Sequence, residues 1–318
     1  MKSLNRISKF SFWLIVYTVL VILWGAWVRI SHSGDGCGDS WPLCQGALLP
    51  ETLQSQKTWV EFVHRIMSGI YGILVIIFWI YARSLRDLAP RLYFWAKWSL
   101  FFTVTEALLG AKLVVFGLVA QNDSPWRLFS MALHLLNSMT LVFCLTKAYL
   151  RTCWIGSELP TVSNKPTISF EVTLVPLILI VLTGVIAALS NTLFPSHDFW
   201  QALRDDFSAE SHYLIRLRIL HPLAGLGLGI LLVAYLWYLV EKKPLTFAAV
   251  SYQQKWYSET IKLVTSLVFV MIVGMLLLFF KNYAVLKLLH LALIYFTWIQ
   301  WIRVSDYKWE LAHKCRDG

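Results

Sequence analysis

Long apolar runs recur along the chain, and short polar or charged stretches separate them. A helix needs roughly 20 mostly apolar residues to cross the hydrocarbon core of a bilayer. Runs of about that length occur at 12–30, 60–81, 93–118, 129–149, 171–190, 213–240, 261–280 and 283–303. The pattern therefore predicts an all-α polytopic membrane protein with eight transmembrane helices. The even number of helices places both termini on the same side.

The second half of the chain repeats features of the first half. His64 and His221 are 157 residues apart, and His134 and His290 are 156 residues apart. A parallel repeat of this kind predicts two four-helix bundles related by an axis along the membrane normal. The expected parts are an N-terminal half at 1–151, a cytoplasmic linker at 152–169 and a C-terminal half at 170–318.

Composition excludes a water-soluble protein. Hydrophobic residues make up 58% of the chain and charged residues 14%, whereas soluble domains carry about 25% charged residues. The net charge of +10 fits basic cytoplasmic loops, because Lys and Arg concentrate on the inner side of a membrane. With cytoplasmic termini, the outer loops hold Lys57, Arg127, Arg204 and Lys281. We expect a bilayer partner and no nucleic-acid partner.

Four histidines fall inside predicted helices, at equivalent positions of the two halves: His64, His134, His221 and His290. Ionisable residues inside a membrane are costly and suggest function. Each lies in the first third of a helix that runs inward, so both pairs are expected near the outer face. Two imidazoles that face each other across a four-helix bundle suit the axial ligation of haem. Zinc fits less well because it normally needs three or four protein ligands, and purely structural histidines remain an alternative.

The residue three positions before each histidine differs between the halves. Glu61 precedes His64, whereas Arg218 precedes His221 and Lys287 precedes His290. Cations suit the propionates of a permanently bound haem, and a carboxylate suits proton transfer or the stabilisation of positive charge. For Glu61, an acid that complements the dipole of a helix start is an equal alternative. The candidate propionate contacts are Arg65, Arg218 and Lys287.

Two cysteines, Cys37 and Cys44, lie in the predicted first outer loop, within a stretch that contains Gly and Pro. Extracytoplasmic compartments are oxidising, which favours a disulfide between them. The pair is either a structural staple or a redox gate beside Glu61 and His64. The other cysteines, Cys144, Cys153 and Cys315, fall on the inner side and are expected to be free thiols.

These features together resemble the heme A synthase family, in its bacterial branch with a cysteine pair. The resemblance lies in the eight helices, the sequence GCGDSWPLC at 36–44, the ExxHR pattern at 61–65 and the histidines at 134, 221 and 290. It implies a multi-pass oxidoreductase of the bacterial inner membrane. Such an enzyme oxidises a porphyrin methyl group of haem O, through an alcohol and a gem-diol, to the formyl group of haem A for terminal oxidases.

The resemblance also implies roles for individual residues. His221 and His290 would bind the iron of a resident haem b. His64 and His134 would be the axial ligands of the substrate haem O, with Glu61 as the catalytic carboxylate. Cys37 and Cys44 match the disulfide pair of the family.

The implied partners are haem O, the enzyme that produces haem O, an unidentified electron donor and, as an open option, further copies of this chain. A di-haem cytochrome b-type electron carrier without substrate chemistry is the alternative function, because it would also use two histidine pairs. A transporter built from repeats fits the topology but leaves the histidines unexplained. Glu61 and the cysteine loop occur in one half only, which favours the enzyme.

Overall fold

The computed structural model describes residues 2–50, 55–154, 171–242, 250–280 and 283–314. The described residues form helices and no regular strand. The helices are α1 (Lys2–Ile30), α2 (Gln56–Ser84), α3 (Pro90–Val115), α4 (Pro125–Trp154), α5 (Glu171–Leu193), α6 (Phe199–Phe207), α7 (Tyr213–Arg218), α8 (Leu220–Lys242), α9 (Val250–Phe279) and α10 (Ala284–Lys314). Eight helical segments are long and apolar enough to cross a bilayer. The predicted all-α polytopic fold is therefore confirmed.

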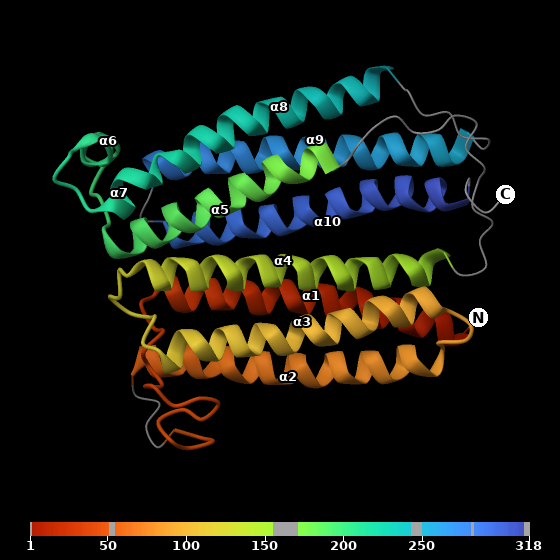
Figure 1. The fold of residues 1–318 in the computed structure, drawn as a ribbon, viewed down its shortest axis with the longest axis horizontal. Helices are drawn as coiled ribbons and strands as arrows, with labels where there is room; N and C mark the ends of the chain where they lie inside the picture. The colour runs from red at the N-terminus through yellow and green to blue at the C-terminus, as the bar shows by residue number, and fades with distance from the viewer. Residues whose placement is uncertain (1, 51–54, 155–170, 243–249, 281–282, 315–318) are drawn as a thin grey trace. The chain divides into compact units, whose positions relative to one another are not determined.

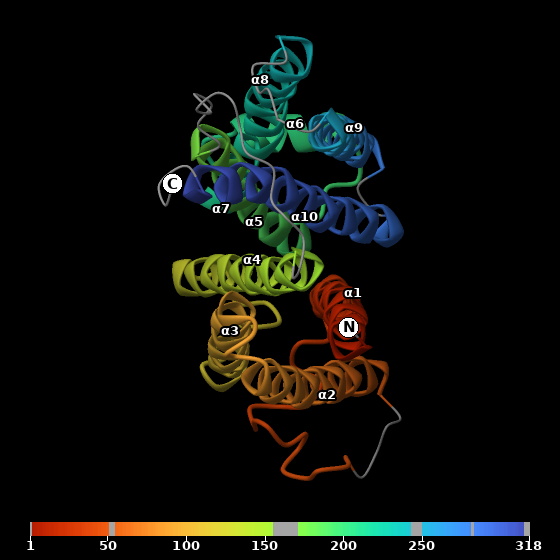
Figure 2. The same ribbon diagram turned by 90° about the vertical axis from the view of Figure 1, so that its right-hand side faces the viewer.

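The chain divides into two compact units, Met1–Ile155 and Gly156–Gly318. In the first unit, α1 packs against α2 and α4, and α3 packs against the same two helices, which closes a four-helix bundle (Figures 1 and 2). In the second unit, α8 packs against α5 and α9, and α10 packs against α9. The predicted linker lies mostly outside the described residues, although α4 continues through its first residues as far as Trp154. The relation of the two units by an internal repeat stays a prediction.

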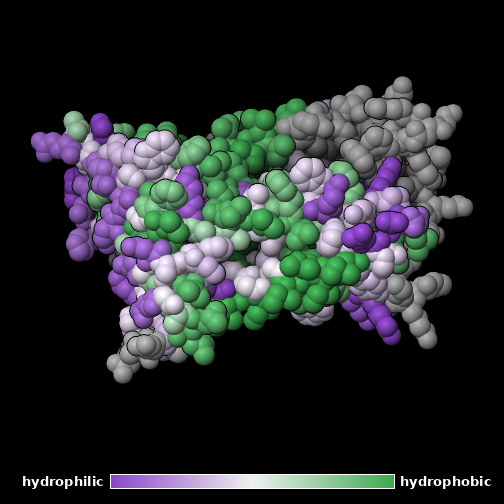
Figure 3. Space-filling view, turned by 60° about the horizontal axis from the view of Figure 1, so that its bottom comes forward, coloured by the Kyte–Doolittle hydropathy of each residue, from purple (hydrophilic) through white to green (hydrophobic). Residues whose placement is uncertain are grey.

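Helix α2 shows why the bundle needs a bilayer. Its buried side includes Val75, Phe78 and Ala82, and each is spaced three or four residues from the next, as one face of a helix requires. Its opposite side is also apolar: the exposed isoleucines there are Ile66, Ile70, Ile73, Ile76, Ile77 and Ile80. Figure 3 shows hydrophobic side chains along the middle of the helices and hydrophilic ones toward the ends. Lipid, unlike water, makes no unfavourable contact with such a surface.

The predicted helix at 213–240 is divided in the structure. Helix α7 ends at Arg218, and α8 begins at Leu220. Pro222 supplies the physical reason, because its ring clashes with the carbonyl of the residue four positions earlier, which is Arg218, and it lacks an amide proton. The break at Ile219 lies two residues before His221, which belongs to the first turn of α8.

The sequence pattern did not predict the short helix α6. Its mean hydropathy is low because it carries Gln, Arg and two Asp residues among its aromatic ones. Asp198 caps the start of the helix at Phe199, and its side chain accepts a hydrogen bond from the amide of Gln201 at 2.8 Å. This local cap, rather than an apolar run, determines where the helix starts.

Candidate functional site

The loop between α1 and α2 is closed by a disulfide bond. Cys37 and Cys44 are joined, with their Cα atoms 4.5 Å apart, so the predicted pairing is confirmed. Both cysteines are buried and pack with Phe62 of α2. Cys44 also exchanges two backbone hydrogen bonds with Ala47, at 2.9 and 3.1 Å. The loop is thus a folded element that lies on the start of α2.

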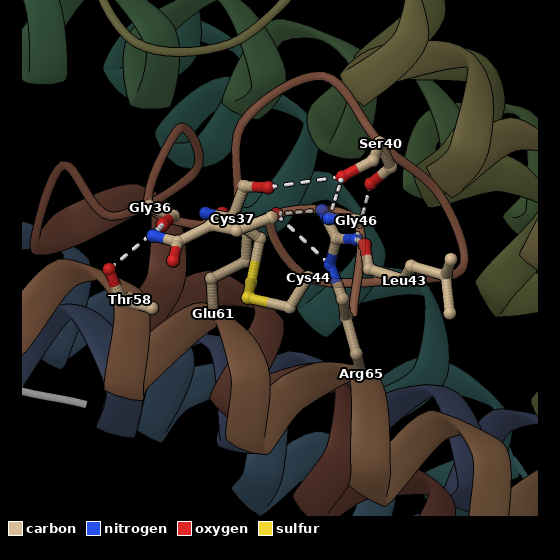
Figure 4. The surroundings of a disulfide bond; sticks show 10 residues. Gly36, Cys37, Ser40, Leu43, Cys44, Gly46, Thr58, Glu61 and Arg65 are labelled. Atoms are coloured by element: carbon tan, nitrogen blue, oxygen red, sulfur yellow. Dashed lines mark hydrogen bonds and ion pairs between the residues drawn. A yellow bond between two sulfur atoms is a disulfide. The ribbon is translucent and has the colours of Figure 1, made fainter. Parts of the chain in front are cut away.

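Glu61 joins this loop to α2 (Figure 4). Its side chain is almost completely buried, and Oε2 accepts a hydrogen bond from the backbone amide of Cys37 at 2.8 Å. Oε1 accepts two hydrogen bonds from Arg65, at 2.6 Å from Nη2 and 3.2 Å from Nε. Nη1 of Arg65 donates to the carbonyl oxygens of Ser40 and Leu43. The carboxylate is therefore held in a fixed position by charge-assisted hydrogen bonds.

The start of α2 also fits closely against the loop. Thr58 Oγ1 donates to the carbonyl of Gly36 at 2.8 Å. A Cβ atom on Gly36 would lie 2.4 Å from the backbone carbonyl of Lys57, which is closer than atoms can approach. Only glycine allows the loop this close approach, which brings the Cys37 amide to Glu61. Loop, disulfide and carboxylate form one assembly.

Each of the four predicted ligand histidines lies against a glycine of another helix in its own unit. A Cβ atom would approach the imidazole Cε1 at 2.9 Å from Gly25 (His64), 3.8 Å from Gly110 (His134), 3.2 Å from Gly184 (His221) and 3.1 Å from Gly274 (His290). At three of the four positions a methyl group would press on the ring. Gly25, Gly184 and Gly274 therefore form notches that hold the imidazoles, whereas Gly110 leaves ordinary van der Waals contact with His134.

The second unit brings its two histidines together. The ring centroids of His221 on α8 and His290 on α10 lie 6.2 Å apart, with the ring planes at 79°. Nδ1 of His221 lies 3.2 Å from the carbonyl of Ile180 and 3.4 Å from Oγ1 of Thr183. Donation from Nδ1 to that carbonyl leaves Nε2 as the nitrogen that is available to bind a metal.

The spacing of this pair fits a haem iron. Two imidazole nitrogens on opposite sides of a metal ion are about 4 Å apart, at about 2 Å per bond, and each nitrogen lies roughly 1 Å from its ring centre. A centroid separation of 6.2 Å matches that sum. Among the described residues, no group of three or more His, Cys, Asp or Glu could hold a bare metal ion. Two histidines alone suit a metal that brings its other ligands with it, as haem does.

The first unit carries its two histidines on two helices of one four-helix bundle, His64 on α2 and His134 on α4. Nδ1 of His64 is buried and makes no hydrogen bond. His134 differs, because its Nδ1 lies 3.5 Å from the carboxylate of Glu106 on α3. Glu106 has no obvious partner in the sequence, because Lys112 is on another face of the helix; the available signal was its position four residues before Gly110, the glycine that lies against His134.

Two of the candidate propionate contacts already have protein partners. Arg65 binds Glu61 and the loop, as described above. Arg218 is buried and pairs with Asp206 of α6 at 2.5 Å, and it also donates to Ser196 and the carbonyl of Ala202. These contacts tie α6 to α7. Lys287 lies one turn before His290 and is half-buried.

The remaining cysteine predictions concern thiols away from this site. Cys144 and Cys153 are both free, the first buried and the second exposed. Cys315 lies outside the described residues.

Three relatives illustrate what the chain resembles. A protein named protoheme IX farnesyltransferase from Thermus thermophilus is 31% identical over 304 residues, which cover 94% of this chain and 48% of that protein. Heme A synthase from Symbiobacterium thermophilum is 35% identical over 171 residues, 54% of this chain and 51% of that protein. Heme A synthase from Bacillus cereus is 42% identical over 118 residues, 35% of this chain and 36% of that protein. The chain thus spans about half the length of the first two relatives and about a third of the length of the third.

The family comparison covers more of the chain. The COX15-CtaA model, described as cytochrome oxidase assembly protein, matches residues 8–302. That range includes the disulfide loop, Glu61 and the four candidate ligand histidines. Because the match runs along nearly the whole chain, this protein belongs to the COX15-CtaA family of cytochrome oxidase assembly proteins.

Proposed function

We propose that this protein is a heme A synthase, which oxidises a porphyrin methyl group of haem O to a formyl group. Membership of the COX15-CtaA family and the two relatives named heme A synthase support the proposal. The net reaction adds the oxygen of one water to the methyl carbon and releases four protons and four electrons, so an electron acceptor outside the chain must take up the electrons. The enzyme therefore needs a site for haem O, a group that handles protons and a route for electrons.

The observation that carries the proposal is the asymmetry between the two units. The described residues of each unit include a pair of histidines that lie against glycines. In the first unit a buried carboxylate, Glu61, lies three residues before His64, and the disulfide-closed loop donates a backbone hydrogen bond to that carboxylate. An electron carrier needs two similar haem sites and has no use for this difference. An enzyme with one substrate haem and one resident haem does.

In the second unit, His221 and His290 would hold a resident haem b. When bound, that haem supplies a one-electron acceptor and donor. The chain's own contribution is orientation: Ile180 fixes the tautomer of His221, and Gly184 and Gly274 leave room for the two rings. Removal of either histidine leaves one axial ligand and should release the haem or change its spin state.

In the first unit, His64 and His134 would position haem O. Glu61 is held by Cys37 and Arg65, so it has a fixed direction from which to accept a proton released as the methyl carbon is oxidised. A positioned acid–base group typically contributes about 10²–10⁴-fold to the rate. The competing interpretation, a carboxylate that only fastens the loop, predicts a loss of stability instead.

The farnesyltransferase relatives suggest where the substrate comes from. A protoheme IX farnesyltransferase attaches a farnesyl chain to haem, and this chain matches about half of two such proteins from Thermus thermophilus. We propose that a prenyltransferase of this type is a partner that delivers haem O within the bilayer, since a farnesylated haem is too apolar to cross water readily. Retention of such an enzyme with the detergent-solubilised chain would support this partner; separation of the two at all detergent concentrations would contradict it.

The proposal is tested by analysing the haems of cells that make haem O and express this chain. Membranes are extracted, and haems B, O and A are separated and quantified by chromatography for the unchanged protein and for four single variants: His64→Ala, His134→Ala, His221→Ala and His290→Ala. We expect haem A with the unchanged protein and none with the first two variants. The last two should also lose the bound haem b.

The outcomes separate the candidate functions. Haem O that stays unconverted although the purified protein carries haem at both sites would identify an electron carrier. Full haem b content in both His221→Ala and His290→Ala would refute the ligand assignment. A protein that binds no haem at all would refute the proposal as a whole.

A further inference from the structure

Helix α3 carries a carboxylate whose place in the membrane needs an explanation. Glu106 lies in the middle of a predicted span, and its side chain is 19% exposed. An ionisable group inside a bilayer is costly and is usually kept for a function. Glu61, the candidate catalytic carboxylate, is on another helix and has its own partners, so the proposed function does not yet use Glu106.

Neighbouring polar residues hold this carboxylate in place. The amide Nδ2 of Asn137 on α4 donates to Oε2 at 2.6 Å, and the hydroxyl of Ser138 donates to Oε1. Asn137 is fixed in turn, because Nδ2 also donates to the carbonyl of Phe102 at 2.9 Å and Oδ1 accepts from Thr105 at 2.7 Å. A network with this many satisfied members specifies one arrangement.

The network is aimed at His134. Oε1 of Glu106 lies 3.5 Å from Nδ1 of His134, and this nitrogen is buried with no hydrogen bond in the structure. The separation is at the outer limit for a hydrogen bond. Such contacts are often long before the ligand binds and tighten in the complex. A shift of a few tenths of an ångström would let Nδ1–H donate to the carboxylate.

The second unit lacks this arrangement at the corresponding places. Glu106 is four residues before Gly110, and Val270 is four residues before Gly274. Nδ1 of His290 is buried without a hydrogen bond, and the backbone carbonyl of Val270 lies near the imidazole. Asn137 and Ser138 follow His134 by three and four residues, where Leu293 and Ile294 follow His290. The carboxylate and its donors are therefore a feature of the first unit.

We propose that Glu106 is a positioning residue for the substrate haem: by accepting a hydrogen bond from Nδ1–H of His134, it directs Nε2 of that ring to the haem iron. This inference rests on the proposed function, because it assumes that His134 is a ligand of haem O. A carboxylate behind a ligand histidine fixes its tautomer and makes it a stronger electron donor. The two haem sites would then differ in the reduction potential of the iron, which would be lower at the substrate site.

The substitution Glu106→Gln keeps the size of the side chain and removes its charge. Loss of a carboxylate behind a ligand typically weakens metal binding or activity about 10–100-fold. We expect the haem associated with His134 to have a higher reduction potential and to be retained less well during purification. The haem b of the second unit should keep its potential and its amount.

The experiment uses the full-length protein purified from cells that make haem O. Bound haems are quantified by extraction, and a spectroscopic redox titration resolves the component that is lost in His134→Ala. Thr105→Val changes the outer part of the network: it removes a hydrogen bond to Asn137 and leaves both donors to the carboxylate, so the potential should change less than in Glu106→Gln. Ser138→Ala, which removes one donor to the carboxylate and keeps the charge, should shift the potential by a smaller amount than Glu106→Gln.

The failure of this inference differs from the failure of the proposed function. A His134-dependent haem whose potential and retention are the same in Glu106→Gln as in the unchanged protein would overturn the positioning role alone. The absence of any His134-dependent haem in the unchanged protein would overturn both. If Glu106→Gln does not fold, an unchanged potential in Ser138→Ala overturns the positioning role.

Discussion

Replacement of Gly25 by alanine tests whether the glycine notches hold the histidines. A Cβ atom at this position would lie 2.9 Å from Cε1 and 3.2 Å from Nε2 of His64. Because carbon atoms pack at about 3.5–4.0 Å, the imidazole would have to retreat by about 0.6 Å or more. Misplacement of a reacting group by about 1 Å can cost about 10²-fold in rate. We expect haem A formation by Gly25→Ala to fall about 10–100-fold, the range typical of lost support for a metal ligand.

The fold should survive this change. Alanine is better than glycine inside a helix by up to about 1 kcal/mol, so α1 itself gains rather than loses stability. The assay therefore combines two measurements: haem A per mole of protein in membranes with a haem O source, and the thermal unfolding midpoint of the purified protein. A lower yield of haem A together with an unchanged midpoint separates the position of His64 from stability.

Gly110→Ala is the matched control in the same unit. Its Cβ atom would lie 3.8 Å from Cε1 of His134, which is ordinary van der Waals contact. Gly69→Ala on α2 adds a methyl group with no atom within 4 Å. Both controls should form haem A at nearly the unchanged rate. The notch argument is wrong if Gly25→Ala does the same, or if Gly110→Ala is affected as strongly as Gly25→Ala.

Three further predictions concern the loops and the carboxylates. Glu61→Gln should reduce haem A formation by about 10²–10⁴-fold while haem b content stays normal; a loss of stability with normal haem A yield would show that Glu61 only fastens the loop. Cys37 and Cys44 should resist alkylation until reduced, and the double Ser variant should lose about 2–4 kcal/mol of stability but keep haem b; labelling without reductant would exclude the disulfide. The backbone amide of Gln201 holds the pKa of the Asp198 carboxyl below its usual value. The cap should therefore stabilise α6 at a pH above the unfolded pKa of Asp198, and this stabilisation should be lost as the pH falls through the folded pKa. If acid weakens the protection of the α6 amides from exchange to the same extent in Asp198→Ala as in the unchanged protein, this prediction is wrong.

The fold could be predicted from the sequence because the bilayer imposes one strong condition. Every spanning segment must be a long apolar helix, and such runs are visible without knowledge of tertiary contacts. The break between α7 and α8 was harder to predict: a proline near the start of a helix is tolerated, so Pro222 alone does not show that the helix is divided. Helix α6 could not be found from apolar periodicity, because it depends on a local cap at Asp198.

The candidate site was predictable to the extent that it rests on rare residues. A histidine inside an apolar run is conspicuous, and so is a pair of cysteines in a short loop. Contacts between segments that are distant in the chain could not be predicted from the sequence. Nothing in the spacing shows that the Cys37 amide binds Glu61, or that Arg218 pairs with Asp206 of α6. Glu106 was missed for the same reason, since its partners His134 and Asn137 lie on the next helix.

The central claim is that one histidine pair holds a substrate haem and the other a resident haem. The most direct measurement is the haem composition of the purified full-length protein from cells that supply haem O, compared with that of His134→Ala. The account predicts haem b in both preparations, and haem O or haem A only in the unchanged protein. Equal amounts of haem O and haem A in the two preparations would contradict it, because His134 would then not be a ligand of the substrate.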